Sequence, residues 1–325
     1  MRKTLHRFTM TALAAFALLA SASVAAQDFP NKPIRIIVPY LPGGVVDILG
    51  RTLANGMPKL LGQSVIVENK PGAGGAIGTE YVVKSVPADG YTLVVTSPGI
   101  PVYPIFNKMT WDPVKDLNHI SILVDGQLVM WTNQQAPYNN FNEMIAYAKA
   151  NPGRMAFGAP GLQSNITMFI EGMKQKFGVD VIIAPFKGTA ETRVAVITNS
   201  IQVGTNDIGT ATQEYQAGRG KPLAVTGPRR VPAFPNVATF AELGHNDFIF
   251  SFWLGLAAPA ATPAPIVSKI SNAVMSIMQT PEAKDAMAKS GLDIVATTPE
   301  GATKRIYSEA AFFTTVAQKA GIKPQ

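Results

Sequence analysis

Short apolar runs alternate with glycine-containing turns and helix-like segments along most of this chain. Residues 34–38 form such a run, and Pro42-Gly43-Gly44 and apolar residues at helical spacing follow it. The same order recurs at 65–84 and at 155–177. Strands buried in parallel sheets read as nearly continuous apolar runs, and strands that alternate with helices favour sheets covered on both faces. The pattern predicts an α/β fold with mostly parallel sheets, and 325 residues are enough for two domains.

The same reading assigns the individual elements. Strands are expected at 34–38, 65–68, 91–96, 128–132, 155–157, 181–183 and 222–226. Helices are expected from 47 to a stop or kink at Pro58, and at 76–84, 141–150, 166–177, 190–198, 266–278, 281–289 and 303–320. Residues 257–265, rich in alanine and proline, are interpreted as a linker.

Residues 1–26 are typical of a cleaved secretory signal. Arg2, Lys3 and Arg7 give a positive start, and residues 12–20 form an apolar core. Val24-Ala25-Ala26 suits the cleavage site, with a second possible cut after 20–22. A membrane anchor is the alternative, but a span needs about 20 apolar residues. We therefore expect export to the periplasm.

Charge and cysteine content exclude several classes of function. The formal charge of +7 comes from 28 basic and 21 acidic residues, and three of the basic ones lie in the signal, which leaves 25 − 21 = +4. The remaining basic residues are scattered, which disfavours nucleic-acid binding. The chain has no cysteine, so disulfides, zinc–thiolate sites and cysteine nucleophiles are excluded.

Few patterns after residue 26 point to catalysis. His119 and His245 stand outside any metal-spaced motif, and neither a G-x-S-x-G elbow nor a P-loop occurs. Residues 72–78 form a G-x-G-x-x-x-G that resembles a dinucleotide loop, but export argues against that cofactor, and tight packing between strand and helix is the better interpretation. We expect no enzyme, no cofactor and no metal.

Four loops after predicted strands are the stronger candidates for a ligand site. In open parallel sheets, ligands bind beyond the carboxyl ends of the strands, where glycine loops and helix N-termini favour anions. Each loop also has a structural alternative, since Asp47, Ser164 or Asn165 can simply cap a helix. The loops are Tyr40–Asp47, Thr96–Gly99, Gly158–Asn165 and Phe186–Thr189. The candidate ligand-binding residues are Tyr40, Pro42, Gly43, Gly44, Val45, Val46, Asp47, Ser97, Gly158, Ala159, Gly161, Gln163, Ser164, Asn165, Lys187, Gly188 and Asn206.

A series of short segments, in this order, resembles the Bug-type extracytoplasmic receptors of tripartite tricarboxylate transporters. The segments lie at 30–40, 42–47, 67–75, 88–93, 112–116, 223–226 and 320–324. Singly they are short, but together they cover nearly the whole chain after the signal. The sequence departs from the family at 158–165, where Pro160, Leu162 and Gln163 replace a Gly/Ser-rich loop, and also at 186–188 and 198–203.

The resemblance implies a two-lobed Venus-flytrap protein that closes on a small organic acid. Domain 1 would comprise residues 27–124 plus 252–325, and domain 2 residues 125–251. The ligand would be a mono-, di- or tricarboxylate, aromatic acids included, and the partners would be membrane permease subunits; a monomer is expected. Two alternatives stay open: a sensor module that signals to a membrane kinase, and an exported enzyme that acts on an organic acid.

Overall fold

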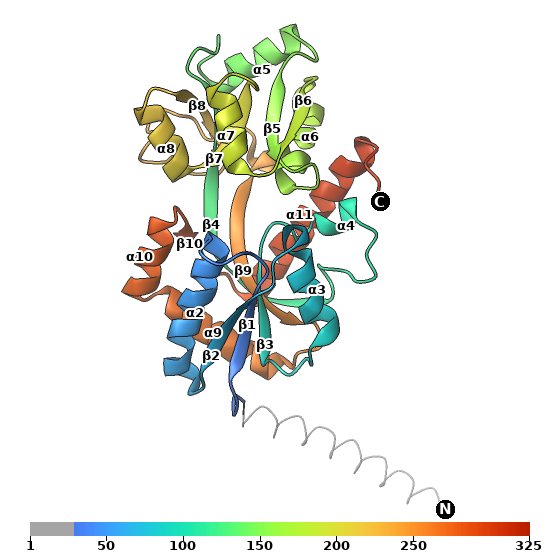
Figure 1. Ribbon diagram of the computed structural model, residues 1–325, viewed down its shortest axis with the longest axis vertical. Coiled ribbons are helices and arrows are strands. Elements are labelled where there is room, and N and C mark those ends of the chain that lie inside the picture. Colours follow the sequence, from blue (N-terminus) through green and yellow to red (C-terminus); the bar gives the residue numbers. More distant parts are fainter. Residues whose placement is uncertain (1–28) are drawn as a thin grey trace, which may run out of the picture.

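The computed structural model of the protein describes residues 29–325, and the expected signal at 1–26 lies outside the described residues. Two α/β lobes stand one above the other, and two long strands, β4 (Leu117–Asn133) and β9 (Ser251–Pro259), run between them (Figure 1). The two-lobed α/β fold predicted from the sequence is confirmed. Within residues 29–325, no helix combines the length and the apolar character that crossing a membrane requires.

The first lobe is built from both ends of the described chain. Its strands follow the order β2-β1-β3-β9-β4, and β1 pairs in parallel with β2 and β3. The strands not yet introduced are β1 (Ile34–Val38), β2 (Val65–Asn69), β3 (Thr92–Thr96) and β10 (Asp293–Ile294). The helical segments are α2 (Val45–Leu61), η1 (Ala73–Gly75), α3 (Ala76–Ser85), α4 (Tyr103–Phe106), α9 (Ala264–Met278), α10 (Pro281–Lys289) and α11 (Pro299–Lys319).

The second lobe contains the middle of the chain. Strand β5 pairs in parallel with β6 and β7, and the second half of β4 pairs antiparallel with β7 and β8. The strands are β5 (Ala156–Pro160), β6 (Ile182–Phe186), β7 (Val203–Asp207) and β8 (Gly220–Val225). The helical segments are α5 (Phe141–Ala150), α6 (Asn165–Phe177), α7 (Thr189–Ile197), α8 (Ile208–Gln216) and η2 (Asn246–Phe248). Both sheets are mixed rather than mostly parallel, because β4 and β9 add antiparallel neighbours.

The crossing strands define where the chain passes from one lobe to the other. Residues 117–127 of β4 pair with β9, whereas residues 128–133 pair with β7 and β8. The end of α11 lies against the second lobe, since Phe313 and Val316 share a buried cluster with Phe169 of α6. The C-terminal helix therefore contacts both lobes, and the expected domain boundaries at 124/125 and 251/252 stay a prediction.

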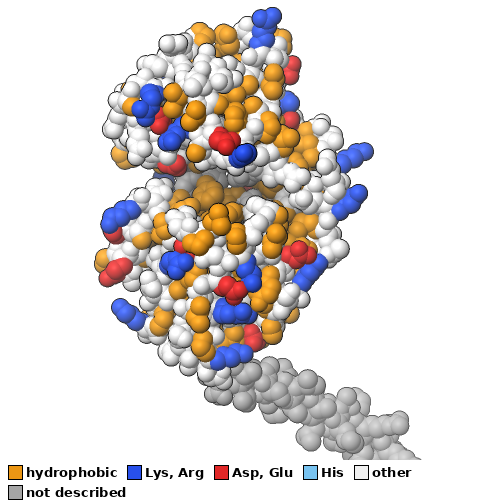
Figure 2. All heavy atoms as spheres, viewed as in Figure 1, with side chains coloured by type: hydrophobic (Ala, Val, Ile, Leu, Met, Phe, Trp, Pro, Cys, Tyr) orange, Lys and Arg blue, Asp and Glu red, His pale blue; other side chains and the backbone are white. Residues whose placement is uncertain are grey.

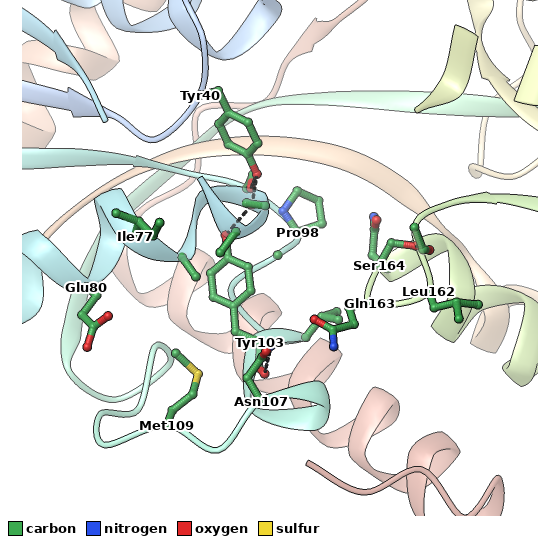
Figure 3. Close-up of a pocket in the computed structure, with 18 of the residues that line it drawn as sticks. Tyr40, Ile77, Glu80, Pro98, Tyr103, Asn107, Met109, Leu162, Gln163 and Ser164 are labelled. Atoms are coloured by element: carbon green, nitrogen blue, oxygen red, sulfur yellow. Dashed lines mark hydrogen bonds between the residues drawn. The ribbon is translucent and has the colours of Figure 1, made fainter. Parts of the chain in front are cut away.

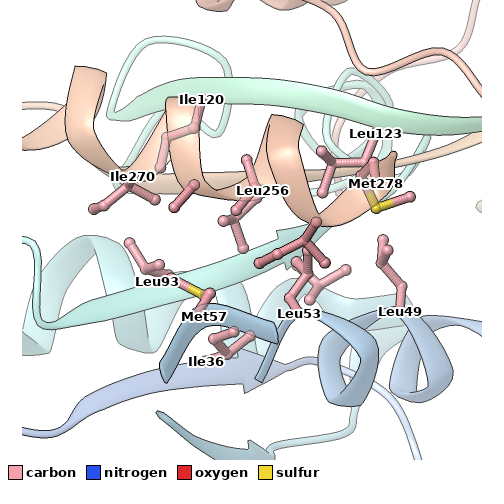
Figure 4. Close-up of a cluster of buried hydrophobic side chains, with 14 of the residues drawn as sticks. Ile36, Leu49, Leu53, Met57, Leu93, Ile120, Leu123, Leu256, Ile270 and Met278 are labelled. Carbon is pink, nitrogen blue, oxygen red and sulfur yellow. The ribbon is translucent and has the colours of Figure 1, made fainter. Parts of the chain in front are cut away.

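The core of the first lobe forms between its sheet and helices α2 and α9. Leu49, Leu53 and Met57 recur at helical spacing on α2, and all three are fully buried against the sheet (Figure 4). Each such side chain contributes about 1.5–3 kcal/mol when it leaves water. The predicted amphipathic helix is thus present, but it continues through Pro58 and ends at Leu61, before Gly62 in the left-handed conformation (φ 75°).

The interpretation of 257–265 as a linker is wrong. Residues 257–259 complete β9, which is buried between β3 and β4. Small residues occur here because the strands approach closely: a Cβ on Gly255 would lie 2.5 Å from the carbonyl oxygen of Ser121. Alanine and glycine therefore reflect packing in a central strand at this place.

Candidate functional site

A cleft of about 700 Å³ opens between the two lobes. The space-filling view shows the hollow between them (Figure 2). The first lobe contributes Tyr40, the segment 73–80 and the segment 97–111, and the second lobe contributes 160–165. These segments follow β1, β2, β3 and β5, so the cleft lies beyond the carboxyl ends of parallel strands, where ligands bind in open α/β sheets.

Two tyrosines and a serine organise the first-lobe wall (Figure 3). The hydroxyls of Tyr40 and Tyr103 both donate to the carbonyl oxygen of Gly74, at 2.7 and 2.9 Å. Since the single Tyr40 proton is used there, Ser97 donates to the Tyr40 oxygen at 2.8 Å. Burial raises the pKa of both tyrosines, so their hydroxyls remain donors at neutral pH. The network holds the turn at 72–75 in place.

The glycines of 72–78 serve close packing, as the sequence suggested, and also form part of the cleft. A Cβ on Gly75 would lie 2.7 Å from the Tyr103 hydroxyl, and one on Gly78 would lie 2.6 Å from the Lys70 carbonyl oxygen. Gly74 has a φ of 64° and open space around it, and it lines the cleft with Ala73. The backbone of this turn is therefore accessible to a ligand.

The second-lobe wall is the turn that leads into α6. Gly161 has a φ of 84°, and its N–H donates to the Phe186 carbonyl at 2.8 Å. Ser164 caps α6 by accepting from the Thr167 N–H at 3.2 Å, and its hydroxyl donates to the Gly161 carbonyl at 2.9 Å. The first N–H groups of a helix lack intrahelical partners and carry partial positive charge, which favours anions. The start of α6 therefore offers backbone donors at the cleft.

Six of the predicted ligand-binding residues line this cleft: Tyr40, Ser97, Gly161, Gln163, Ser164 and Asn165. Gln163 extends from the second lobe into the gap between the lobes (Figure 3). The structure thus brings together parts of three of the four predicted loops. The remaining eleven predicted residues do not line it: Pro42, Gly43, Gly44, Val45, Val46, Asp47, Gly158, Ala159, Lys187, Gly188 and Asn206.

Asp47 forms hydrogen bonds within the first lobe. Its buried carboxylate accepts from the Gly43 N–H at 2.9 Å, from Arg51 at 2.8 Å and from Asn69 at 2.9 Å. Burial alone would raise its pKa, but the hydrogen bonds from Arg51, Gly43 and Asn69 lower it to about 2. The carboxylate therefore holds the loop before α2, and Gly44 rather than Asp47 is the N-cap.

Other predicted residues have structural roles away from the cleft lining. Gly158, Ala159 and Asn206 are buried within β5 and β7, and a Cβ on Gly158 would lie 2.3 Å from the Thr192 side chain. Gly188 is the N-cap of α7, and the backbone N–H of the exposed Lys187 donates to Glu191 at 3.1 Å. The end of a strand indicates which sheet edge a loop occupies, but not which way its side chains point.

The segment 98–111 is the largest part of the cleft that the sequence reading missed. It contributes α4 and residues Asn107, Lys108, Met109, Thr110 and Trp111. The connection from β3 to β4 runs from 97 to 116, and connections of this length in compact domains are usually functional. Its length was the available signal.

Charged side chains are sparse around the cleft. In the part of the chain that the structure describes, Glu80 and Lys108 are the charged residues that line it. Glu80 pairs with Lys84 at 2.8 Å. Within residues 29–325, no group of three or more His, Asp or Glu side chains is placed to hold a metal ion. The site is suited to binding by backbone and neutral polar groups.

The chain is similar to receptors of one transport family over most of its length. The model of the tripartite tricarboxylate transporter family receptor matches residues 49–322. A Cupriavidus necator protein from the gbd 5′ region is 36% identical and covers 87% of this chain and 86% of its own. BugT of Bordetella pertussis is 32% identical, with 93% and 94% covered.

Solved structures share the fold. The periplasmic binding protein BugD has a TM-score of 0.72 at 28% identity, with 91% of this chain and all of that chain covered. The R. palustris protein Rpa4515, solved with adipate, has a TM-score of 0.74 at 27% identity, with 92% and 100% covered. MatC from Rhodopseudomonas palustris, with bound malate, has a TM-score of 0.71 at 25% identity, with 89% and 100% covered. This chain therefore belongs to the tripartite tricarboxylate transporter receptor family, whose members are solute-binding receptors, as its sequence motifs predicted.

Proposed function

We propose that this protein is a periplasmic receptor that captures a small organic acid between its lobes and delivers it to a tripartite tricarboxylate-type permease. The observation that carries the proposal is the cleft at the carboxyl ends of β1, β2, β3 and β5, lined by both lobes. The relatives solved with adipate and malate support an acid as ligand. Binding without chemical conversion agrees with a family of receptors.

In the proposed mechanism, the start of α6 binds the carboxylate of the ligand. Its backbone N–H groups and the Asn165 side chain lie at the cleft, and one favourable helix-terminus contact contributes about 0.3–1 kcal/mol, or up to about 2 kcal/mol when partly buried. A ligand that contacts both lobes binds the closed form more tightly than the open form, so it shifts the population toward closure. Strands β4 and β9 connect the lobes and are the natural hinge. The closed form would then dock on the permease.

A thermal-shift screen tests this function. We expect an organic acid at about 100 times its dissociation constant to stabilise the protein by about 2.7 kcal/mol, which raises the melting temperature by on the order of 5 °C. The screen should contain mono-, di-, tri- and aromatic carboxylates, with neutral sugars and a peptide as controls. A shift with a sugar or peptide but with no acid would contradict the proposal.

We also propose that the loop at 40–47 contacts the ligand in the closed form, although only Tyr40 lines the open cleft. Gly44 is exposed with a φ of −80°, and a Cβ there would meet only the Leu41 carbonyl oxygen, at 3.9 Å. Gly44→Leu therefore fits the fold, and we expect it to weaken acid binding by about tenfold because the side chain would occupy the ligand's place. Calorimetric titration measures the affinity, and an unchanged melting temperature without ligand is the control. Unchanged affinity would remove this loop from the site.

A further inference from the structure

We propose that the cleft selects monocarboxylic acids with an apolar body, and that Ile77 and Leu162 contact this body from opposite lobes. The proposal rests on the proposed function, since it specifies the class of acid that the same cleft binds. Two independent features carry it: the apolar side chains of the lining and the shortage of positive charge there.

Large aliphatic side chains are left in water on both sides of the cleft. Ile77, at the start of α3 in the first lobe, is 54% exposed, and Leu162, in the turn before α6 of the second lobe, is 53% exposed. Both line the cleft, together with Met109 and Trp111 (Figure 3). Hydrophobic side chains also gather along the hollow between the lobes in the space-filling view (Figure 2). Exposed apolar surface grouped in a concave site is typical of a binding surface.

The charges of the lining match one carboxylate. Among the described residues that line the cleft, Lys108 and Glu80 are the only charged ones, and the Glu80 carboxylate is neutralised by Lys84. One positive charge, that of Lys108, is left to attract an anion. A second carboxylate would lose its water on closure without a cation to replace it, and burying an unpaired charge is strongly unfavourable.

The polar groups of the second-lobe turn are largely used within the turn. The Ser164 hydroxyl donates to the Gly161 carbonyl and accepts from Thr167, and Thr167 also donates to Gly161. The turn leaves the backbone at the start of α6 and Asn165 for a carboxylate, and it places Leu162 beside them. One carboxylate and an apolar body therefore account for both parts of this wall.

Hexanoate and adipate test the selectivity, because they have six carbons each and differ only in that adipate ends in a second carboxylate. We expect the dissociation constant of hexanoate, measured by calorimetric titration, to be at least about tenfold lower than that of adipate. Benzoate, a compact apolar acid, should also bind more tightly than adipate. Equal binding of hexanoate and adipate, or tighter binding of adipate, would overturn the selectivity.

Leu162→Asn and Ile77→Asn test the contact residues. Each is expected to weaken hexanoate binding by roughly threefold to tenfold and to leave adipate binding unchanged. Ile182→Asn is the matched control, since Ile182 on β6 of the second lobe is 52% exposed but does not line the cleft. If Leu162→Asn and Ile77→Asn weaken both acids equally, these side chains stabilise closure and do not select the ligand, which contradicts the proposal.

The outcomes separate the two levels of the argument. Binding of adipate without hexanoate or benzoate would leave the organic-acid receptor intact and reject the apolar selectivity. Binding of a neutral sugar, with no binding of any of the acids, would reject both.

Discussion

Replacing Arg305 by methionine is expected to lower the free energy of unfolding by about 3 kcal/mol. Arg305 of α11 forms ion pairs with Asp125 of β4 and with Glu309, and it donates to Ser251 of β9 at 2.7 Å. Its side chain is 28% exposed, and the two carboxylates would remain partly buried without their cation. Burial already raises the pKa of Glu309, although Arg305 and Trp253 favour its ionised form. Methionine keeps the packing volume and removes only the charge.

Urea unfolding of the ligand-free protein measures this loss. Arg229→Met is the matched control, because Arg229 pairs with Asp293 in the same region at 2.8 Å, but both side chains are more than half exposed, at 64% and 57%. Exposed pairs of this kind contribute between zero and about 1 kcal/mol. If both variants lose the same small amount, the Arg305 cluster does not stabilise the hinge. Arg305→Lys should fall between the wild type and Arg305→Met, since lysine keeps the charge but not the fork of donors.

Replacing Asp47 by asparagine is expected to lower the free energy of unfolding at pH 7 by about 2 kcal/mol. The folded-state pKa of about 2 lies below the ordinary value of 3.8, and each unit corresponds to about 1.4 kcal/mol. The side chain is only 4% exposed, so solvent screens these hydrogen bonds little. Asparagine has nearly the same shape but is neutral, so the stabilisation of the ionised form is lost.

The pH dependence identifies the cause. Between pH 2 and pH 3.8 the unfolded chain binds a proton at Asp47 that the folded protein does not bind, so this carboxylate stabilises the fold above that range and ceases to do so as the pH falls through it. The difference in unfolding free energy between wild type and Asp47→Asn should therefore shrink as the pH falls from about 5 toward 2. Asp285→Asn on α10, where the side chain is 62% exposed, is the control with little effect. A difference that stays constant with pH would show that the loss is not ionic.

Local sequence signals predicted much of the scaffold correctly. The apolar runs at 34–38 and 128–132 lie in strands, and the Ser164 cap and Leu49–Met57 stripe belong to helices. These features depend on neighbours a few residues away, so their pattern is legible in one dimension. Strand β9 was missed because its Ala and Gly residues, which resemble a linker, are required by the close approach of β3 and β4.

The candidate site was predicted in part, at the level of loops. Tyr40, Ser97 and the turn at 161–165 line the cleft as the strand-end rule suggests. The rule was not applied to the turn after β2, where Ala73 and Gly74 also line it. Asp47 illustrates the limit: its partner Asn69 is 22 residues away in sequence, and their hydrogen bond shows only in the folded chain.

The sequence by itself determined the α/β class, the family and the loops from which a ligand site is built, because these follow from periodicity, turn residues and ordered motifs. Only the tertiary structure decided which side chains share the cleft, how α11 contacts the second lobe, and that Ile77 and Leu162 belong to the same cavity. The physical reason is distance along the chain: 85 residues separate those two positions, and their proximity depends on two lobes docked through β4 and β9, which no local pattern encodes.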